Sequence, residues 1–138
     1  MTIALIATKR VVRDLEAAER FYRAIGLKFV ARNVGGEDEV RQEQCWLSAS
    51  GDASTHLLIL TRFLELPPPD QPVYPGEAWL AFRVSDVDRI LTAMRESGGK
   101  ILRPAQDRPE HNVRAAVVSD PEGHVIEIVG PMRAAPPG

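Results

Sequence analysis

Cysteine is nearly absent from this 138-residue sequence: Cys45 is the only one, which excludes an internal disulfide and favours a reducing compartment. Long apolar runs are also missing, and none approaches the roughly 18 residues that span a membrane. Neither sign of charge dominates, because 17 Lys and Arg stand against 19 Asp and Glu, and the net charge of −2 offers no basic field to nucleic acid. These absences predict a cytoplasmic protein that binds neither a membrane nor nucleic acid.

The patterns that are present alternate between strand and helix. Asp14 is a favourable N-cap for a helix that Gly26 ends, and Asp86 and Gly98 bound a second helix in the same way. Apolar and β-branched runs around each helix predict strands. The predicted elements are a helix over 15–25 with strands over 3–12, 27–33, 40–47 and 56–61, then a helix after Asp86 with strands over 78–84, 100–102, 113–118 and 125–129.

The two halves match at a fixed distance of 72 residues. The matching pairs are Val12 and Val84, Asp14 and Asp86, Gly26 and Gly98, and Lys28 and Lys100. This repeat predicts an α+β fold of two βαβββ modules that form a curved mixed sheet around a shared cleft, with the helices on the outside. The expected organisation is a single domain over 1–138, with module 1 over about 3–65, a Pro-rich linker over 66–76, module 2 over about 77–130 and a C-terminal tail over 131–138.

Two stretches carry a resemblance to a known family. The first runs from Val12-Arg13-Asp14-Leu15 through Phe21-Tyr22 to Gly26-Leu27, and the second is the closing segment 120–127, Asp-Pro-Glu-Gly-His-Val-Ile-Glu. Over residues 3–130 the sequence resembles the vicinal-oxygen-chelate superfamily, which includes glyoxalase I, extradiol dioxygenases, fosfomycin-resistance transferases and bleomycin-binding proteins. The resemblance implies a small organic ligand in the cleft, and a homodimer, because members of this superfamily commonly complete the cleft by pairing.

The resemblance also implies where a metal would be bound. Metal-dependent members hold a divalent ion on His or Glu side chains from the first and last strand of each module, and these positions fall on Ala7, Ile59, Trp79 and Glu127. Alanine and isoleucine have no ligand atom, and indole offers only an N–H donor. One carboxylate does not make a tight metal site. We therefore expect no metal and no other cofactor, which counts against a glyoxalase or a dioxygenase.

The strand that contains Glu127 indicates which side chains face the cleft. Ile126 and Ile128 point to one face and are expected to pack on a helix, so Glu127 projects from the other face. Two roles for Glu127 stay open at this point: an ion pair with Lys9 or Arg83, and a general base. The expected ligand-binding residues are Lys9, Ile59, Thr61, Trp79, Arg83 and Glu127, with Glu127 as the candidate catalytic residue.

The remaining candidates rest on weaker signals. Trp79 is either a stacking surface for a ligand or an ordinary packing aromatic. His111 lies in a predicted loop, where a solvated side chain is favoured over a place at the mouth of the cleft, and His124 is expected at the surface. Arg114 either binds an anionic group or faces solvent, and Cys45-Trp46 is expected to be a packed strand segment.

Three functions follow from these patterns. The first is a metal-independent protein that binds a small organic molecule, of the drug-binding or bleomycin-resistance type. The second is a lyase or isomerase that acts on a small carbonyl compound, with Glu127 as the general base and Lys9 or Arg83 as an electrostatic stabiliser. The third is a non-catalytic module that binds a protein partner. The sequence does not identify the ligand or the substrate.

Overall fold

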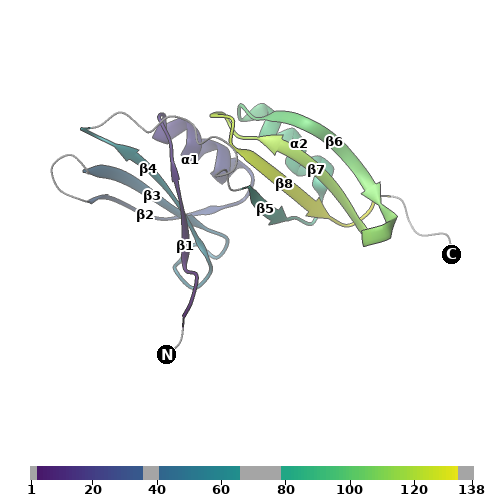
Figure 1. Cartoon of the computed structure of the whole chain (residues 1–138), viewed down its shortest axis with the longest axis horizontal. Coiled ribbons are helices and arrows are strands. Elements are labelled where there is room, and N and C mark those ends of the chain that lie inside the picture. The colour runs from purple at the N-terminus through teal and green to yellow at the C-terminus, as the bar shows by residue number, and fades with distance from the viewer. Residues whose placement is uncertain (1–2, 36–40, 66–78, 134–138) are drawn as a thin grey trace. The chain divides into compact units, whose positions relative to one another are not determined.

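Each half of the chain folds into its own sheet with one helix packed against it (Figure 1). The computed structural model describes residues 3–35, 41–65 and 79–133. They belong to two compact units, Met1–Val73 and Tyr74–Gly138, which we name unit 1 and unit 2. The predicted linker over 66–76 lies outside the described residues, as does most of the predicted tail. The single-domain organisation therefore stays a prediction.

Unit 1 has the predicted order of elements. They are β1 (Ala7–Val11), α1 (Leu15–Ala24), β2 (Lys28–Gly35), β3 (Gln42–Ser48) and β4 (Leu57–Phe63). The strand order is β1-β4-β3-β2, with β1 parallel to β4 and the other neighbours antiparallel. The predicted strand over 3–12 is too long at its start, because β1 begins only at Ala7 and residues 3–6 are exposed.

Unit 2 repeats this connectivity. Its elements are β5 (Leu80–Arg83), α2 (Val87–Glu96), β6 (Lys100–Arg108), the short 3₁₀-helix η2 (Pro109–His111), β7 (Val113–Ser119) and β8 (Val125–Gly130). The strand order is β5-β8-β7-β6, again with one parallel pair, β5 and β8. β6 is much longer than the predicted strand over 100–102. Its register with β7 shifts between Arg103 and Gln106, and this irregularity accommodates Pro104 within the strand.

The helix boundaries follow the predicted caps in both units. The Asp14 carboxylate accepts a hydrogen bond from the backbone N–H of Ala17 at 3.0 Å, and Asp86 accepts one from Arg89 at 3.1 Å. Gly26 follows the first helix with a φ of +117°, a conformation that glycine adopts without strain. None of the described helices is long and apolar enough to cross a membrane.

The apolar core of each unit lies between its helix and its sheet. In unit 1 the buried rings of Phe21 and Tyr22 meet edge to face, with centroids 5.0 Å apart. In unit 2 Met94 of α2 is buried, as are Ile126 and Ile128 of β8. The α+β class and the two βαβββ modules are therefore confirmed, each module with a four-stranded mixed sheet. The predicted cleft shared by the modules stays a prediction.

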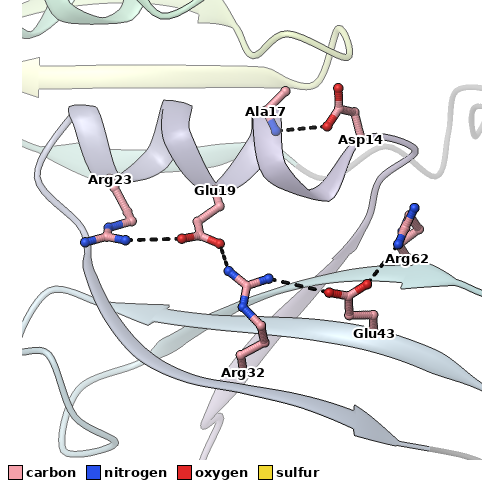
Figure 2. A network of polar contacts seen from close by, with 7 residues as sticks. All are labelled: Asp14, Ala17, Glu19, Arg23, Arg32, Glu43 and Arg62. Atoms are coloured by element: carbon pink, nitrogen blue, oxygen red, sulfur yellow. Dashed lines mark hydrogen bonds and ion pairs between the residues drawn. The ribbon is translucent and has the colours of Figure 1, made fainter.

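An ionic network ties α1 to three strands of unit 1 (Figure 2). Glu19 accepts hydrogen bonds from Arg23 at 3.2 Å and from Arg32 of β2. Arg32 also pairs with Glu43 of β3 at 3.6 Å, and Glu43 accepts a hydrogen bond from Arg62 of β4 at 2.8 Å. Burial alone would raise the pKa of Glu19, but the hydrogen bonds from Arg32 and Arg23 outweigh it and hold this pKa below its ordinary value.

Unit 2 has a smaller ionic network, in which one arginine is bound by two carboxylates, whereas in unit 1 the Glu19 carboxylate is bound by two arginines. Arg114 of β7 donates from Nε and Nη2 to the Asp88 carboxylate of α2, both at 3.0 Å, and from Nη1 to Asp107 of β6 at 3.3 Å. The hydrogen bonds from Arg114 are the main reason that the pKa of Asp88 lies below its ordinary value. Both sequence-based alternatives for Arg114, a ligand anion or solvent, are therefore wrong, because two carboxylates of unit 2 already bind it.

Candidate functional site

A hollow of about 910 Å³ lies on the face of the unit 2 sheet that α2 does not cover, which we call the helix-free face. Its floor is made by alternate small apolar residues of β7, among them Val113, Ala115 and Val117. Polar and aromatic side chains surround this floor. They are Trp79, Arg103, Gln106, Arg108, Glu110, His111 and Glu127. The volume suits an organic ligand of modest size.

Hydrogen-bond register places Glu127 in the middle of this face. Glu127 is opposite Ala81 of β5 on one side and Val117 of β7 on the other. Val117 in turn is opposite Arg103 of β6. The four residues form one row across the sheet, so the Cα atoms of Arg103 and Glu127 are about 10 Å apart. A guanidinium and a carboxylate therefore border the same apolar floor.

Glu127 is half-buried, and no Lys or Arg among the described residues of unit 2 forms an ion pair with it. Arg83 does not supply the expected partner, because it is exposed on the edge strand β5, opposite Val129, and is not part of the lining of the hollow. The predicted ion pair between Glu127 and Arg83 is therefore wrong. The other expected partner, Lys9, belongs to unit 1, so the ion pair between Glu127 and Lys9 stays a prediction.

Two further lining residues come from the ends of strands. Trp79 immediately precedes β5 and is 57% exposed, so its indole is not an ordinary packing aromatic. His111 ends η2, after which Asn112 adopts a left-handed φ of 54° and returns the chain into β7. His111 is exposed, which agrees with the favoured prediction of a solvated side chain, and it also lines the hollow.

The sequence analysis missed the residues that β6 contributes, Arg103, Gln106 and Arg108. They were missed because Pro104 favours a strand end, whereas the strand continues through the irregularity. No alternation of apolar and polar residues marks this part of the strand, because Gln106, Asp107 and Arg108 are all polar. Once the strand is known to continue, its period of two places Gln106 and Arg108 on the same face.

The structure places the other predicted ligand residues in unit 1, on the sheet face that α1 does not cover. Lys9 is exposed, whereas Ile59 and Thr61 are only 5% and 2% exposed. Lys9 and Ile59 are direct neighbours in register, and Thr61 lies two residues further along β4. Of the six predicted residues, the unit 2 hollow brings together only Trp79 and Glu127.

His124 was expected at the surface, and this prediction is wrong, because only 8% of the residue is exposed. It follows a tight turn in which the Asp120 carboxylate accepts hydrogen bonds from the backbone N–H groups of Glu122 and His124, at 2.9 and 3.0 Å. These bonds draw the start of β8 inward. His124 therefore contributes to the turn and does not line the hollow.

The residues at the family's metal positions do not fit a metal ion. Ala7 and Ile59 have no donor atom, and Trp79 has only an N–H group, so Glu127 is the one side chain that could coordinate. Among the described residues no three His, Cys, Asp or Glu side chains gather as a metal centre would need. We therefore derive no chemistry through a metal.

The chain therefore consists of two βαβββ units, and the sheet of one unit has a ligand-sized hollow lined by an indole, guanidinium groups and a carboxylate. The chain belongs to the Glyoxalase/Bleomycin resistance protein/Dioxygenase superfamily, whose family model matches residues 3–128. The predicted resemblance is thereby confirmed.

Individual relatives support this membership. The uncharacterised protein YraH of Bacillus subtilis (strain 168) is 28% identical over 129 residues, which cover 90% of this chain and 95% of YraH. A glyoxalase family protein from Bacillus cereus has the same fold, with a TM-score of 0.79, 22% identity, and coverage of 94% of this chain and 95% of that one. The V278E mutant of glyoxalase I from Zea mays is 28% identical with a TM-score of 0.75, and the match covers 91% of this chain and 45% of the maize chain.

Proposed function

We propose that this protein binds a small organic molecule without a metal ion, in the hollow of unit 2. The observation that supports the proposal most strongly is that Trp79 and Glu127, singled out separately in the sequence, line one hollow together with Arg103. A purely structural carboxylate in mid-strand would be expected to have a cationic partner, and Glu127 has none among the described residues of unit 2.

The lining specifies the kind of molecule. Trp79 offers a flat surface on which a ring can stack. Arg103 and Arg108 donate hydrogen bonds to carbonyl or carboxylate oxygens on one side of the hollow. On the other side Glu127 accepts a hydrogen bond from a hydroxyl or amine. A ring compound with a hydrogen-bond acceptor at one end and a hydrogen-bond donor at the other fits this arrangement. The proposed ligands include drugs that have these groups.

A second candidate function is a lyase or isomerase that acts on a small carbonyl compound. It is favoured by the half-buried Glu127, which forms no ion pair with a described residue of unit 2 and whose carboxylate could accept the proton from the carbon next to the carbonyl. The Arg103 guanidinium would hold the carbonyl oxygen as negative charge develops on it. In an isomerase the same carboxyl group returns the proton to the product, so the step needs no external oxidant or reductant.

The partner-binding function has no observation of its own in the described residues. The cytoplasmic location and the homodimer also stay predictions. The homodimer accords with the superfamily, whose members often form dimers. Sedimentation of the purified protein would test the dimer.

A thermal-shift screen of small aromatic carbonyl compounds and acids, followed by calorimetry of each hit, tests the proposed function. Trp79→Ala should weaken binding by about tenfold, since stacking on one aromatic ring contributes about 1 kcal/mol or more. Phe29→Ala is the control, because Phe29 is an exposed aromatic residue of β2 in unit 1. Equal affinity of wild type and Trp79→Ala for every hit would contradict the proposal.

Glu127→Gln separates the two candidates. If Glu127 is a general base, this change abolishes turnover of an active carbonyl compound and leaves its affinity within about threefold of wild type, because the amide keeps the shape of the side chain but cannot take a proton. If the protein only binds its ligand, no turnover exists and affinity alone changes. Glu96→Gln, at the exposed end of α2, is the matched control.

A further inference from the structure

The helix of unit 1 leaves part of its own sheet uncovered. α1 packs mainly against β3 and β4, whereas α2 of unit 2 packs against β6, β7 and β8. The outer strand β2 therefore has exposed residues on its helix side, Arg32 and, two positions later, Val34. A hollow of about 380 Å³ lies there, which we call the α1–β2 hollow. It is lined by Glu16, Glu19, Arg20 and Arg23 of α1 and by Arg32 of β2.

Two guanidinium groups converge in this hollow because one carboxylate binds both of them (Figure 2). Glu19 accepts hydrogen bonds from Arg23 at 3.2 Å and from Arg32, and only 14% of its side chain is exposed. The side chains of Arg23 and Arg32 are 53% and 40% exposed. Since a guanidinium has five N–H donors and Glu19 takes one from each arginine, both groups keep donors for an acceptor in the hollow.

Arg20 adds a third guanidinium to the same hollow. It lies three residues before Arg23, so the two side chains are neighbours on the surface of α1. Unlike Arg23, Arg20 forms no ion pair with a described residue of unit 1. Three positive charges at close range repel one another, and the carboxylate of Glu19 between them offsets a single charge. An anion that all three arginines share would remove this repulsion.

Glu16 also lines the hollow, but it lies at the opposite end. It is seven residues before Arg23, which is about 10 Å along the axis of a helix. Glu16 is exposed and forms no ion pair with a described residue of unit 1. The hollow therefore has a cationic end, which contains the three arginines, and an end with one solvated carboxylate.

Unit 2 does not repeat this cluster. The residues 72 positions after the three arginines are Thr92, Arg95 and Pro104. Leu91 is where Glu19 would be, and it is buried in the apolar core. Because the repeat folds without these charges in unit 2, the βαβββ fold does not require the arginine cluster.

We propose that the α1–β2 hollow is a binding site for the phosphate group of a small molecule, bound by the guanidinium groups of Arg20, Arg23 and Arg32. A phosphate group carries about two negative charges at neutral pH and three strong acceptor oxygens. The planar fork of a guanidinium matches these oxygens, and a carboxylate offers less charge and fewer acceptors. The site lies on the helix side of unit 1 and does not depend on the function proposed for the unit 2 hollow.

The test is an NMR titration of the full chain with inorganic phosphate, phenyl phosphate and benzoate. Chloride is exchanged for each probe at constant ionic strength, so that the general screening of charges stays the same. Saturable shifts are expected at the backbone amides of Arg20, Arg23 and Arg32. We expect dissociation constants of about 1 to 10 mM for the phosphates and binding of benzoate at least about fivefold weaker.

The three probes also separate the possible ligands. The tighter of the two phosphates shows whether the source is free phosphate or a phosphate ester, whereas benzoate bound as tightly as either would overturn the choice of phosphate. Shifts confined to β7 and β8 would place a probe in the unit 2 hollow. That result overturns this proposal and leaves the proposed function intact.

Two variants with opposite expected effects complete the test. Arg20→Gln should weaken the binding of phosphate by about fivefold, because it removes one charge-assisted contact and leaves the ion pairs of Glu19 in place. Glu16→Gln should strengthen the binding by about twofold, because it removes a negative charge from the lining. Arg95→Gln, in the last turn of α2, is the matched control and should change nothing.

Two results would overturn the proposal. One is the absence of shifts in α1 and at Arg32 up to about 50 mM of each phosphate. The other is equal affinity of Arg20→Gln and Arg95→Gln for phosphate, since the anion would then respond only to the overall charge of the protein. If Arg20→Gln fails to fold, Glu16→Gln decides, because an affinity that is unchanged or weaker in this variant removes the hollow as the site.

Discussion

The two units share connectivity, helix caps and strand order, yet the middle of their helix-free faces is occupied differently. In unit 1 the central row across the sheet contains Lys9, Ile59 and Trp46. The corresponding row of unit 2 contains Ala81, Glu127 and Val117.

The cation is therefore on the edge strand in unit 1 and the anion is on the inner strand in unit 2. The residues in the middle of this face can therefore differ between the units while the fold is kept.

The helix side of the two sheets differs as well, in the kind of contact that joins helix to sheet. Glu19 of α1 and Leu91 of α2 are 72 residues apart, and the first belongs to the ionic network whereas the second is buried in the apolar core. We therefore expect the stability of unit 2 to depend more on apolar packing and that of unit 1 to depend more on charge.

The largest effect is expected for Leu91→Ala in unit 2. Leu91 is 7% exposed, and removal of a buried leucine side chain leaves a cavity that costs about 2 to 4 kcal/mol of unfolding free energy. Urea unfolding followed by circular dichroism measures this loss. If Leu91→Ala loses less unfolding free energy than Glu19→Ala in unit 1, unit 2 does not depend more on apolar packing than unit 1 depends on charge.

Gly130→Ala should destabilise unit 2 by about 1 to 3 kcal/mol, because overpacking strains a tight site. A Cβ atom at this position would lie 2.7 Å from the backbone oxygen of Val84 and 2.8 Å from a methyl group of Val87. Gly35→Ala in unit 1 is the control, since a Cβ there meets nothing within 4 Å. Equal shifts of the urea midpoint for both variants would show that the close contacts at Gly130 are not the cause of the lost stability.

Glu19→Gln should cost about 1 to 2 kcal/mol, because it removes the charge that accepts from Arg23 and Arg32 at the partly exposed edge of unit 1. The folded pKa of Glu19 is below its ordinary value, so its contribution is present above the unfolded pKa and is lost as the pH falls through the folded pKa. The difference in unfolding free energy between wild type and Glu19→Gln should therefore shrink below about pH 4. A difference that stays constant down to pH 2 would contradict this prediction.

Reactivity is a separate property of unit 1, and it concerns Cys45, which is buried in β3 beside this network. Burial, and then the neighbouring Glu19 carboxylate, raise the pKa of the Cys45 thiol to about 12. Since the thiolate is the reactive form, the native protein should react with a thiol reagent at pH 8 at least about a hundredfold more slowly than the urea-unfolded chain. Rapid labelling of the native protein would show that the thiol is accessible.

Much of the fold could be predicted because its signals are local. Asp14 and Asp86 cap their helices through a side chain and an N–H group three residues away, and Gly26 ends the first helix at the predicted place. The orientation of Glu127 followed from the alternation of side chains in one strand.

The features that were missed depend on contacts between strands or on a turn. The hydrogen bond from the Thr61 hydroxyl of β4 to Gln42 of β3 requires the register of two strands, which no single strand contains. β6 continues past Pro104 because β7 pairs with it on both sides of the irregularity. His124 is buried because Asp120 binds two backbone N–H groups of the turn, which the composition of the turn did not reveal.

The most direct test of the central claim, that the ligand site works without a metal ion, is elemental mass spectrometry. The protein would be measured as purified and again after incubation with nickel, zinc, manganese or iron(II) and removal of free metal. The account predicts less than about a tenth of an equivalent of any metal, because Glu127 alone does not make a tight site. A stoichiometric metal that strengthens ligand binding would contradict it and would place the protein among the metal-dependent members of its family.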